Sequence, residues 1–419
     1  MNRNDNSSHA KELTTVVYTL TNDPVPNGNA VVAFHQHADG SLVPLAGSPF
    51  PTGGAGWKSE FSMPHFGPFD MDQTIVLSAD KKRLFTVNGG SDTIAVFDIK
   101  EDGALEPVPG SPFASGGKNP VSIGIAGNYI VVVNKNEDPG RDMSKSLPNY
   151  TTFTVAENGK LIPVADSTLE LETPSRSPTQ ALIVNERFIY DGDFGNFHLP
   201  AREEMWGKSV NDQKPSLIRV MEISKQGKLS ILQELTAPVG SFDGDLATNA
   251  EGKSNVLMFG LQVHPKEPLI YVAMVTASKL AVYEYDDTGK LTFVSLAPNS
   301  GGLICWVTIN KAGTRAYTTN NATDSISVYD LTDPRSPKEI QHYELRGHGA
   351  PYQMALSSDD KYLYTIKHRT FADTPVGDGG TLNVLHIDED GKISESKYSP
   401  VNVPSRGDLL GRPLGLATR

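Results

Sequence analysis

The chain has almost no cysteine and no long apolar run. Cys305 is the single cysteine among 419 residues, which excludes an internal disulfide. No apolar stretch reaches the roughly 18 residues that a membrane-spanning helix needs. The first residues, 1–12, carry no apolar core of the kind found in export signals. These absences predict a cytoplasmic protein without a membrane partner.

Positive charge is also scarce. The chain holds 37 Lys and Arg against 49 Asp and Glu, a formal net charge of −12. Binding to nucleic acid needs a basic surface, so we expect no nucleic-acid partner. No glycine-rich loop follows a strand and opens a helix, and no spacing of His, Cys or acidic residues matches a metal site. We therefore expect no cofactor and no metal, and a chain that acts as a monomer on a small molecule.

What the chain has in abundance is turns, with 38 glycines and 29 prolines. A short phrase recurs seven times: an alternating apolar run, a polar turn, usually with glycine, and a second short strand. The glycine supplies the positive φ that tight hairpins need, and alternation with period two indicates half-buried strands. The copies span residues 31–45, 95–108, 152–164, 219–232, 281–294, 327–340 and 383–394.

A second phrase precedes the first in most copies, again as strand, turn and strand. Together the two phrases give four strands per repeat, which is typical of the blades of a β-propeller. The sequence therefore predicts an all-β fold with seven blades of four antiparallel strands. We expect residues 13–419 to form this one domain, behind a disordered tail at 1–12. The second phrase is found at 74–88, 122–134, 181–193, 261–274, 306–320 and 353–367.

The two ends of the chain complete one blade. The first repeat enters at LTTVVYTL (13–20), which corresponds to the second strand of the other repeats, so its first strand is missing. The segment RPLGLAT (412–418) resembles the beginning of the strand NPVSIGIAG (119–127). We expect the C-terminal segment to supply the innermost strand of blade 1, because closure removes exposed sheet edges.

Long loops indicate where a ligand would bind. In a propeller, the loops between blades and those between second and third strands converge on one mouth of the central channel. Several of these loops are long and contain aromatic residues such as Trp57 and Trp206, which argues against disorder. We expect them to form an ordered cap over the channel. The segments are 51–70, 134–150, 191–216, 237–255 and 367–380.

Two histidines in these loops are candidate general bases. His198 and His368 both have acidic residues nearby in the sequence, and a carboxylate partner keeps an imidazole basic near neutral pH. We expect Asp193 to orient the base. Arg176 is the candidate that stabilises negative charge on a reacting oxygen.

The repeats resemble a known family. VPLAGSPFPTGG (43–54), PVPGSPFASGG (107–117) and SADKKRLFTVNGGSDTIAVFDIKEDGALEPV (78–108) are similar to segments of the lactonase-type seven-bladed propellers. That family includes propeller 6-phosphogluconolactonases and the fungal carboxymuconate-lactonizing enzymes. The resemblance covers essentially the whole chain and implies a propeller fold with lactonase or cyclase activity.

The predicted inner strands begin with neutral side chains where the resemblance implies His or Arg. Amide and indole groups suit a neutral ligand better than a sugar phosphate, so 6-phosphogluconolactone is not the expected substrate. Loop cations and histidines are further candidates for binding. The expected substrate-binding residues are His65, Gln180, Arg202, Trp206, Gln262, Trp306, His348, Gln353, Lys367 and Arg412.

Two functions remain open from the sequence. The first is an enzyme that hydrolyses or closes a lactone or related cyclic molecule at the channel mouth. The second is a propeller without catalytic activity that binds a protein or a small ligand on the same face. The missing His and Arg favour the second function, and the long loops favour the first.

Overall fold

The computed structural model describes most of the chain. The described residues are 13–57, 71–138, 141, 143, 145–173, 175–195, 214–238, 240–242, 254, 256–347, 349–368, 380–404 and 412–419. The tail predicted at 1–12 lies outside them, so its disorder stays a prediction.

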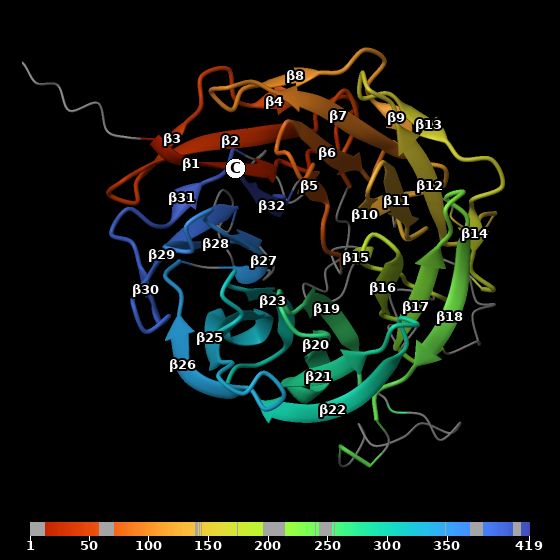
Figure 1. The fold of residues 1–419 in the computed structure, drawn as a ribbon. Helices are drawn as coiled ribbons and strands as arrows, with labels where there is room; N and C mark the ends of the chain where they lie inside the picture. The colour runs from red at the N-terminus through yellow and green to blue at the C-terminus, as the bar shows by residue number, and fades with distance from the viewer. Residues whose placement is uncertain are drawn as a thin grey trace, which may run out of the picture.

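The described residues form seven antiparallel sheets arranged around a central channel (Figure 1). In six sheets the first four strands follow the chain from the channel outward, and in blade 1 the C-terminal strand is innermost, as the repeat predicted. The all-β, seven-bladed propeller is thus confirmed. Within the described ranges, no helix is long and apolar enough to cross a membrane.

Blades 1 to 3 are built mainly from the first half of the chain. From the channel outward, blade 1 consists of β32 (Leu414–Thr418), β1 (Leu13–Leu20), β2 (Ala30–His37) and β3 (Leu42–Pro44), and β4 (Phe50–Pro51) also pairs with β2. In blades 2, 3 and 7 the last short strand likewise pairs with the third strand. Blade 2 consists of β5 (Ile75–Leu77), β6 (Arg83–Asn88), β7 (Thr93–Ile99), β8 (Leu105–Pro107) and β9 (Phe113–Ala114). Blade 3 consists of β10 (Pro120–Ala126), β11 (Tyr129–Asn134), β12 (Asn149–Val155), β13 (Leu161–Pro163) and β14 (Leu169–Glu170).

Blades 4 to 7 follow the same order. Blade 4 consists of β15 (Leu182–Val184), β16 (Phe188–Asp193), β17 (Leu217–Ile223) and β18 (Leu229–Leu235), and blade 5 of β19 (Met258–Val263), β20 (Leu269–Met274), β21 (Lys279–Tyr285) and β22 (Leu291–Pro298). Blade 6 consists of β23 (Ile304–Ile309), β24 (Arg315–Asn320), β25 (Ser325–Asp330) and β26 (Lys338–Glu344). Blade 7 consists of β27 (Ala350–Leu356), β28 (Tyr362–His368), β29 (Thr381–Ile387), β30 (Ile393–Glu395) and β31 (Val401–Asn402). Among the described residues, single 3-10 turns follow β20 at η2 (Val275–Ala277) and β24 at η3 (Asn321–Thr323).

The ring closes within blade 1, as predicted. β32 pairs with β1 in an antiparallel ladder in which Val17 lies opposite Thr418 and Tyr18 opposite Ala417. Val16 and Arg419 exchange two backbone hydrogen bonds of 3.2 and 2.9 Å just beyond the ladder. The two ends of the chain therefore form one sheet, and blade 1 has no missing inner edge.

The hairpin glycines of the repeat also join neighbouring blades. Tyr18, in the second strand of blade 1, donates its hydroxyl to the carbonyl of Gly103 in the outer hairpin of blade 2, at 2.8 Å. Tyr190 and Gly289 make the same contact between blades 4 and 5, at 2.9 Å. These tyrosines have little or no exposed surface, and a buried hydroxyl must find a partner. The contact therefore fixes how one blade sits against the next.

The central channel as the candidate functional site

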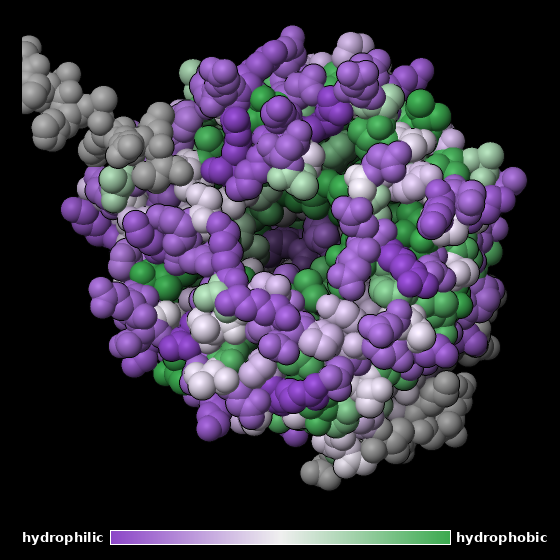
Figure 2. Space-filling model, in the orientation of Figure 1, coloured by the Kyte–Doolittle hydropathy of each residue, from purple (hydrophilic) through white to green (hydrophobic). Residues whose placement is uncertain are grey.

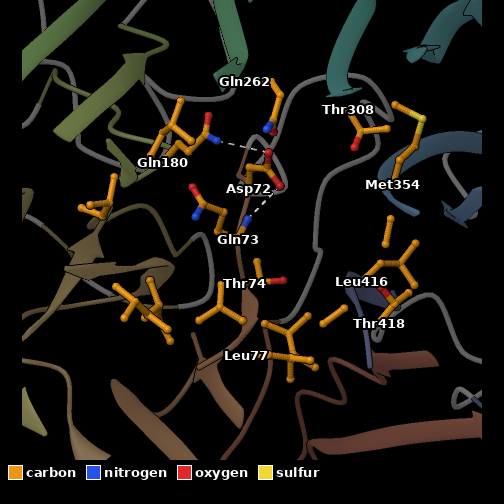
Figure 3. A pocket seen from close by; sticks show the side chains of 18 of the residues that line it. Asp72, Gln73, Thr74, Leu77, Gln180, Gln262, Thr308, Met354, Leu416 and Thr418 are labelled. Carbon is orange, nitrogen blue, oxygen red and sulfur yellow. Dashed lines mark hydrogen bonds between the residues drawn. The ribbon is translucent and has the colours of Figure 1, made fainter. Parts of the chain in front are cut away.

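The central channel encloses a cavity of about 540 Å³ to which the inner strands of all seven blades contribute. Its wall combines aliphatic side chains with polar groups, and at one end Asp72 lies near Gln73, Gln180 and Gln262 (Figure 3). Ser78, Ala79 and Lys81, in the turn between β5 and β6, line the other end. Figure 2 views the ring along this channel, with a hollow at its centre and hydrophilic residues at its depth. The aliphatic lining is Ile75, Leu77, Ile123, Ile125, Leu182, Ile183, Val307, Met354 and Leu416.

The segment 71–73 closes the polar end of the cavity. Trp306 Nε1 and Gln353 Nε2 both donate to the carbonyl of Met71, at 3.0 and 2.8 Å. The Asp72 amide donates to the Thr179 carbonyl at 3.1 Å, and the Ile123 amide donates to the Gln73 carbonyl at 3.1 Å. Because blades 3, 4, 6 and 7 all hold this segment, it is a fixed plug rather than a free loop.

The carboxylate of Asp72 sits on this plug and is half-buried. Its Oδ1 accepts the Gln73 amide at 2.8 Å, and its Oδ2 accepts Gln180 Nε2 at 3.4 Å. Among the described residues it takes part in none of the ion pairs. Burial raises the pKa of Asp72 to about 7, although the Gln73 hydrogen bond opposes the rise. Asp72 therefore exchanges a proton near neutral pH, which is the property expected of an acid–base group.

The predicted amide lining is used mostly to join blades. Gln180 makes a two-pronged pair with Leu261, accepting its N–H and donating to its carbonyl, both at 2.9 Å. Gln353 accepts the Gly415 amide at 3.2 Å while it holds the plug. Gln262 differs, because its side-chain hydrogen bond to the Val263 carbonyl is 3.5 Å long. Gln262 is therefore the predicted amide best able to bind a ligand in the cavity.

Trp306 and His368 belong to a row of rings that runs through blades 4 to 7. His368 stacks on Tyr352 with 3.6 Å between ring centroids, and Tyr352 lies 4.5 Å from Trp306. Phe259 and Phe194 continue the row with edge-to-face contacts. His368 is fully buried, and burial together with nearby Arg412 holds its pKa well below the usual range. The imidazole is thus neutral and weakly basic at physiological pH.

Asp193 and Arg176 lie in blade 4 and do not line the cavity. Asp193 is the last residue of β16 rather than part of the following insert, and its Oδ2 accepts Arg219 Nη2 at 2.9 Å. Burial opposes its ionisation, but Arg219 and Arg176 outweigh burial and lower the pKa of Asp193. Arg176 donates to Glu172 at 2.8 Å and to the Pro215 carbonyl at 3.2 Å. Their geometry is that of a buried salt-bridge network.

Lys367 and Arg412 also lie away from the cavity. Lys367 is the penultimate residue of β28, fully buried, with its Nζ 2.6 Å from Asp324 and bonded to the carbonyls of Arg346 and Gly347. Arg412 is buried beside His368. Lys367 is therefore engaged in holding the 346–347 segment. Among the described residues no three His, Cys, Asp or Glu side chains gather as metal ligands.

The remaining predicted site residues lie outside the described part of the chain. They are His65, His198, Arg202, Trp206 and His348. The same holds for most of the predicted cap, so that cap stays a prediction. Sequence reasoning missed Asp72, whose signal was its position between a long loop and the first inner strand of blade 2.

No protein-family model and no curated protein sequence matches the chain. Solved structures do match over its whole length. A "putative 6-phosphogluconolactonase" from Bacteroides uniformis has a TM-score of 0.66 at 13% identity, covering 97% of this chain and 99% of that one. The periplasmic gluconolactonase of Pseudomonas aeruginosa has a TM-score of 0.65 at 13% identity, with coverage of 97% and 99%. The chain thus has the fold of the lactonase-type seven-bladed propellers, as the repeats indicated.

Proposed function

We propose that the protein hydrolyses an uncharged lactone that enters the central channel and reacts at Asp72. One observation carries the proposal: a cavity lined by aliphatic and uncharged polar groups ends at a single carboxyl group beside amide donors. The fold it shares with structures described as lactonases supports the reaction class. The cytoplasmic location stays a prediction.

The size and charge of the cavity support a small neutral substrate. Sites for small molecules usually enclose about 300–1,000 Å³, and this cavity of about 540 Å³ falls within that range. Its charged lining residues are Asp72 at the closed end and Lys81 at the opposite end. A phosphate beside Asp72 would meet like charge, whereas an uncharged ring can fill the aliphatic part.

The reaction follows from the chemistry of a carboxylate with a pKa near 7. Ionised Asp72 takes a proton from water as the water oxygen attacks the lactone carbonyl carbon. Gln262 Nε2 is the group we assign to the developing oxyanion, because its own bond is long. The ring C–O bond then breaks, and Asp72 returns the proton to the leaving alkoxide. The product is the hydroxy acid, and every atom of the water is retained in it.

We assign the base to Asp72 in place of His368. His368 is fully buried, and its low pKa makes it a poor proton acceptor at neutral pH. Asp72 lines the cavity and has a pKa of about 7, which balances proton affinity against availability of the ionised form. His198 lies outside the described residues and stays a candidate base.

The test is hydrolysis of a panel of uncharged γ- and δ-lactones. A pH-stat measures the rate at which the hydroxy acid is released. Asp72→Asn should lower kcat/KM by about 10²–10⁴-fold, and the wild-type rate should rise with pH through about 7. Asp80→Asn is the matched control, because Asp80 is an exposed carboxylate in the turn at the other end of the channel. Full activity of Asp72→Asn on a lactone that the wild type hydrolyses would overturn the assignment.

A propeller that only binds its ligand is the second candidate. The observation in its favour is that the side-chain amides of Gln180 and Gln353 form hydrogen bonds with other blades, which leaves few groups to stabilise an oxyanion. Thermal-shift measurements with the same lactones distinguish the two functions. A stabilising ligand that is never turned over would favour binding.

A further inference from the structure

Asp191 is a buried carboxylate one strand away from the channel. It lies in β16, is fully buried and does not line the cavity. Its Oδ2 accepts Tyr150 Oη at 2.6 Å and Arg219 Nη1 at 3.3 Å. Its Oδ1 accepts the backbone amides of Thr179 and Gln180 at 2.8 and 2.9 Å. One carboxylate therefore joins a buried cation to two consecutive peptide groups.

The same two residues hold Asp72. The Thr179 carbonyl accepts the Asp72 amide at 3.1 Å, and Gln180 Nε2 lies 3.4 Å from Asp72 Oδ2. Gln180 is itself fixed by its two-pronged pair with Leu261. Residues 179 and 180 thus form a short bridge, with Asp191 on one side and Asp72 on the other.

Blade 4 is distinguished by this carboxylate. Five of the second strands, β6, β11, β16, β20 and β24, have six residues each. Their fourth residues are Thr86, Val132, Asp191, Val272 and Thr318. A propeller blade therefore forms without an acid at this position, so blade formation alone does not account for Asp191.

We propose that Asp191 is a positioning residue for the Asp72 site, acting through the backbone of Thr179 and Gln180. The inference rests on the proposed function, because it concerns the group assigned as the base. Asp191 fixes the bridge, the bridge fixes Asp72 against the plug, and that placement limits the hydration of the Asp72 carboxyl.

The groups around Asp191 explain why it can act in this way. Arg219 pairs with Asp191, Asp193 and Glu234, so one cation is shared among three carboxylates. It also donates a hydrogen bond to the hydroxyl of Tyr150. Burial raises the pKa of Asp191 to about 6, although Arg219 opposes the rise. Asp191 is therefore largely ionised at pH 7, the form that accepts both backbone amides.

The test measures the pKa of Asp72 directly, by ¹³C NMR titration of aspartate carboxyl carbons, with Asp72→Asn to assign the resonance. The wild-type midpoint should lie at about 7. In Asp191→Asn the bridge loosens, Asp72 becomes hydrated, and its midpoint should fall by about one pH unit or more. Tyr150→Phe removes one hydrogen bond to Asp191 with little change in volume and should give a smaller fall.

The matched control is Asp324→Asn, which removes the partner of another fully buried cation, Lys367, and lies in blade 6. It should leave the midpoint of Asp72 unchanged. Unchanged midpoints in folded Asp191→Asn and Tyr150→Phe, or an equal fall in the control, would overturn the inference. The titration needs no substrate, so absence of lactone turnover would overturn the proposed function and leave this result intact.

Discussion

At the scale of single residues, the plug keeps a carboxyl group in an environment that disfavours its charge. Asp72 gains two hydrogen bonds, one of them at 3.4 Å, and no ion pair with a described residue. Folding therefore raises its pKa to about 7 from an ordinary value of about 3.9. Such a cost to stability is common where a group has a functional role, because catalysis needs a proton affinity that water does not give.

The stability of Asp72→Asn should differ from that of the wild type in a pH-dependent manner. The folded wild type binds a proton more tightly than the unfolded chain, so its stability is lost as pH rises from about 4 to about 7. Asp72→Asn has no carboxyl group to ionise here, so its free energy of unfolding does not fall in this way. Above pH 7 it should exceed that of the wild type by at most about 4 kcal/mol. Urea unfolding at pH 5 and pH 8 checks this. Equal curves at pH 8 would contradict it.

At the scale of elements, inner strands approach one another closely enough to require glycine. Gly260 in β19 has a φ of +55°, and a Cβ built there would lie 2.0 Å from the carbonyl oxygen of Cys305 in β23. Backbone rather than a flexible side chain blocks the space, so neither strand can yield cheaply. Close packing of β19 on β23 thus depends on the absence of one side chain.

Gly260→Ala should therefore destabilise the protein by roughly 2–4 kcal/mol, through the clash and the left-handed backbone together. Gly302→Ala is the control, because its nearest neighbours lie at 3.3 Å and its φ is not in the left-handed region. Guanidinium unfolding of the two variants gives the comparison. A loss of less than about 1 kcal/mol for Gly260→Ala would show that the strands separate more readily than their packing indicates.

At the scale of the whole molecule, the ring depends on one short C-terminal strand. β32 pairs with β1 and also contributes Leu416, Ala417 and Thr418 to the cavity wall. Without it, β1 presents unpaired backbone groups to the channel, and blades 7 and 2 lose the strand that lies between them. The two ends of the chain therefore support the fold and the site at once.

Removal of residues 408–419 should abolish cooperative unfolding and lower the recovery of monomer. The reason is that exposed inner edges of strands associate with other chains. Calorimetry and size-exclusion chromatography measure the two effects. Addition of a peptide with the sequence of residues 412–419 should restore part of the transition. A truncated chain that stays monomeric with an unchanged transition would contradict the role of closure.

The sequence alone determined the fold, because strand alternation and turn glycines are local signals that seven repeats reinforce. It also placed Gln180, Trp306 and Gln353 at the starts of inner strands. Their roles could not be predicted from the sequence, because each bonds to residues of another blade. Only the tertiary structure placed Asp72 in the wall of the cavity. Its raised pKa comes from burial, and the residues that hold its segment by hydrogen bonds, Ile123, Thr179, Trp306 and Gln353, lie far apart in the sequence and meet only when the ring closes.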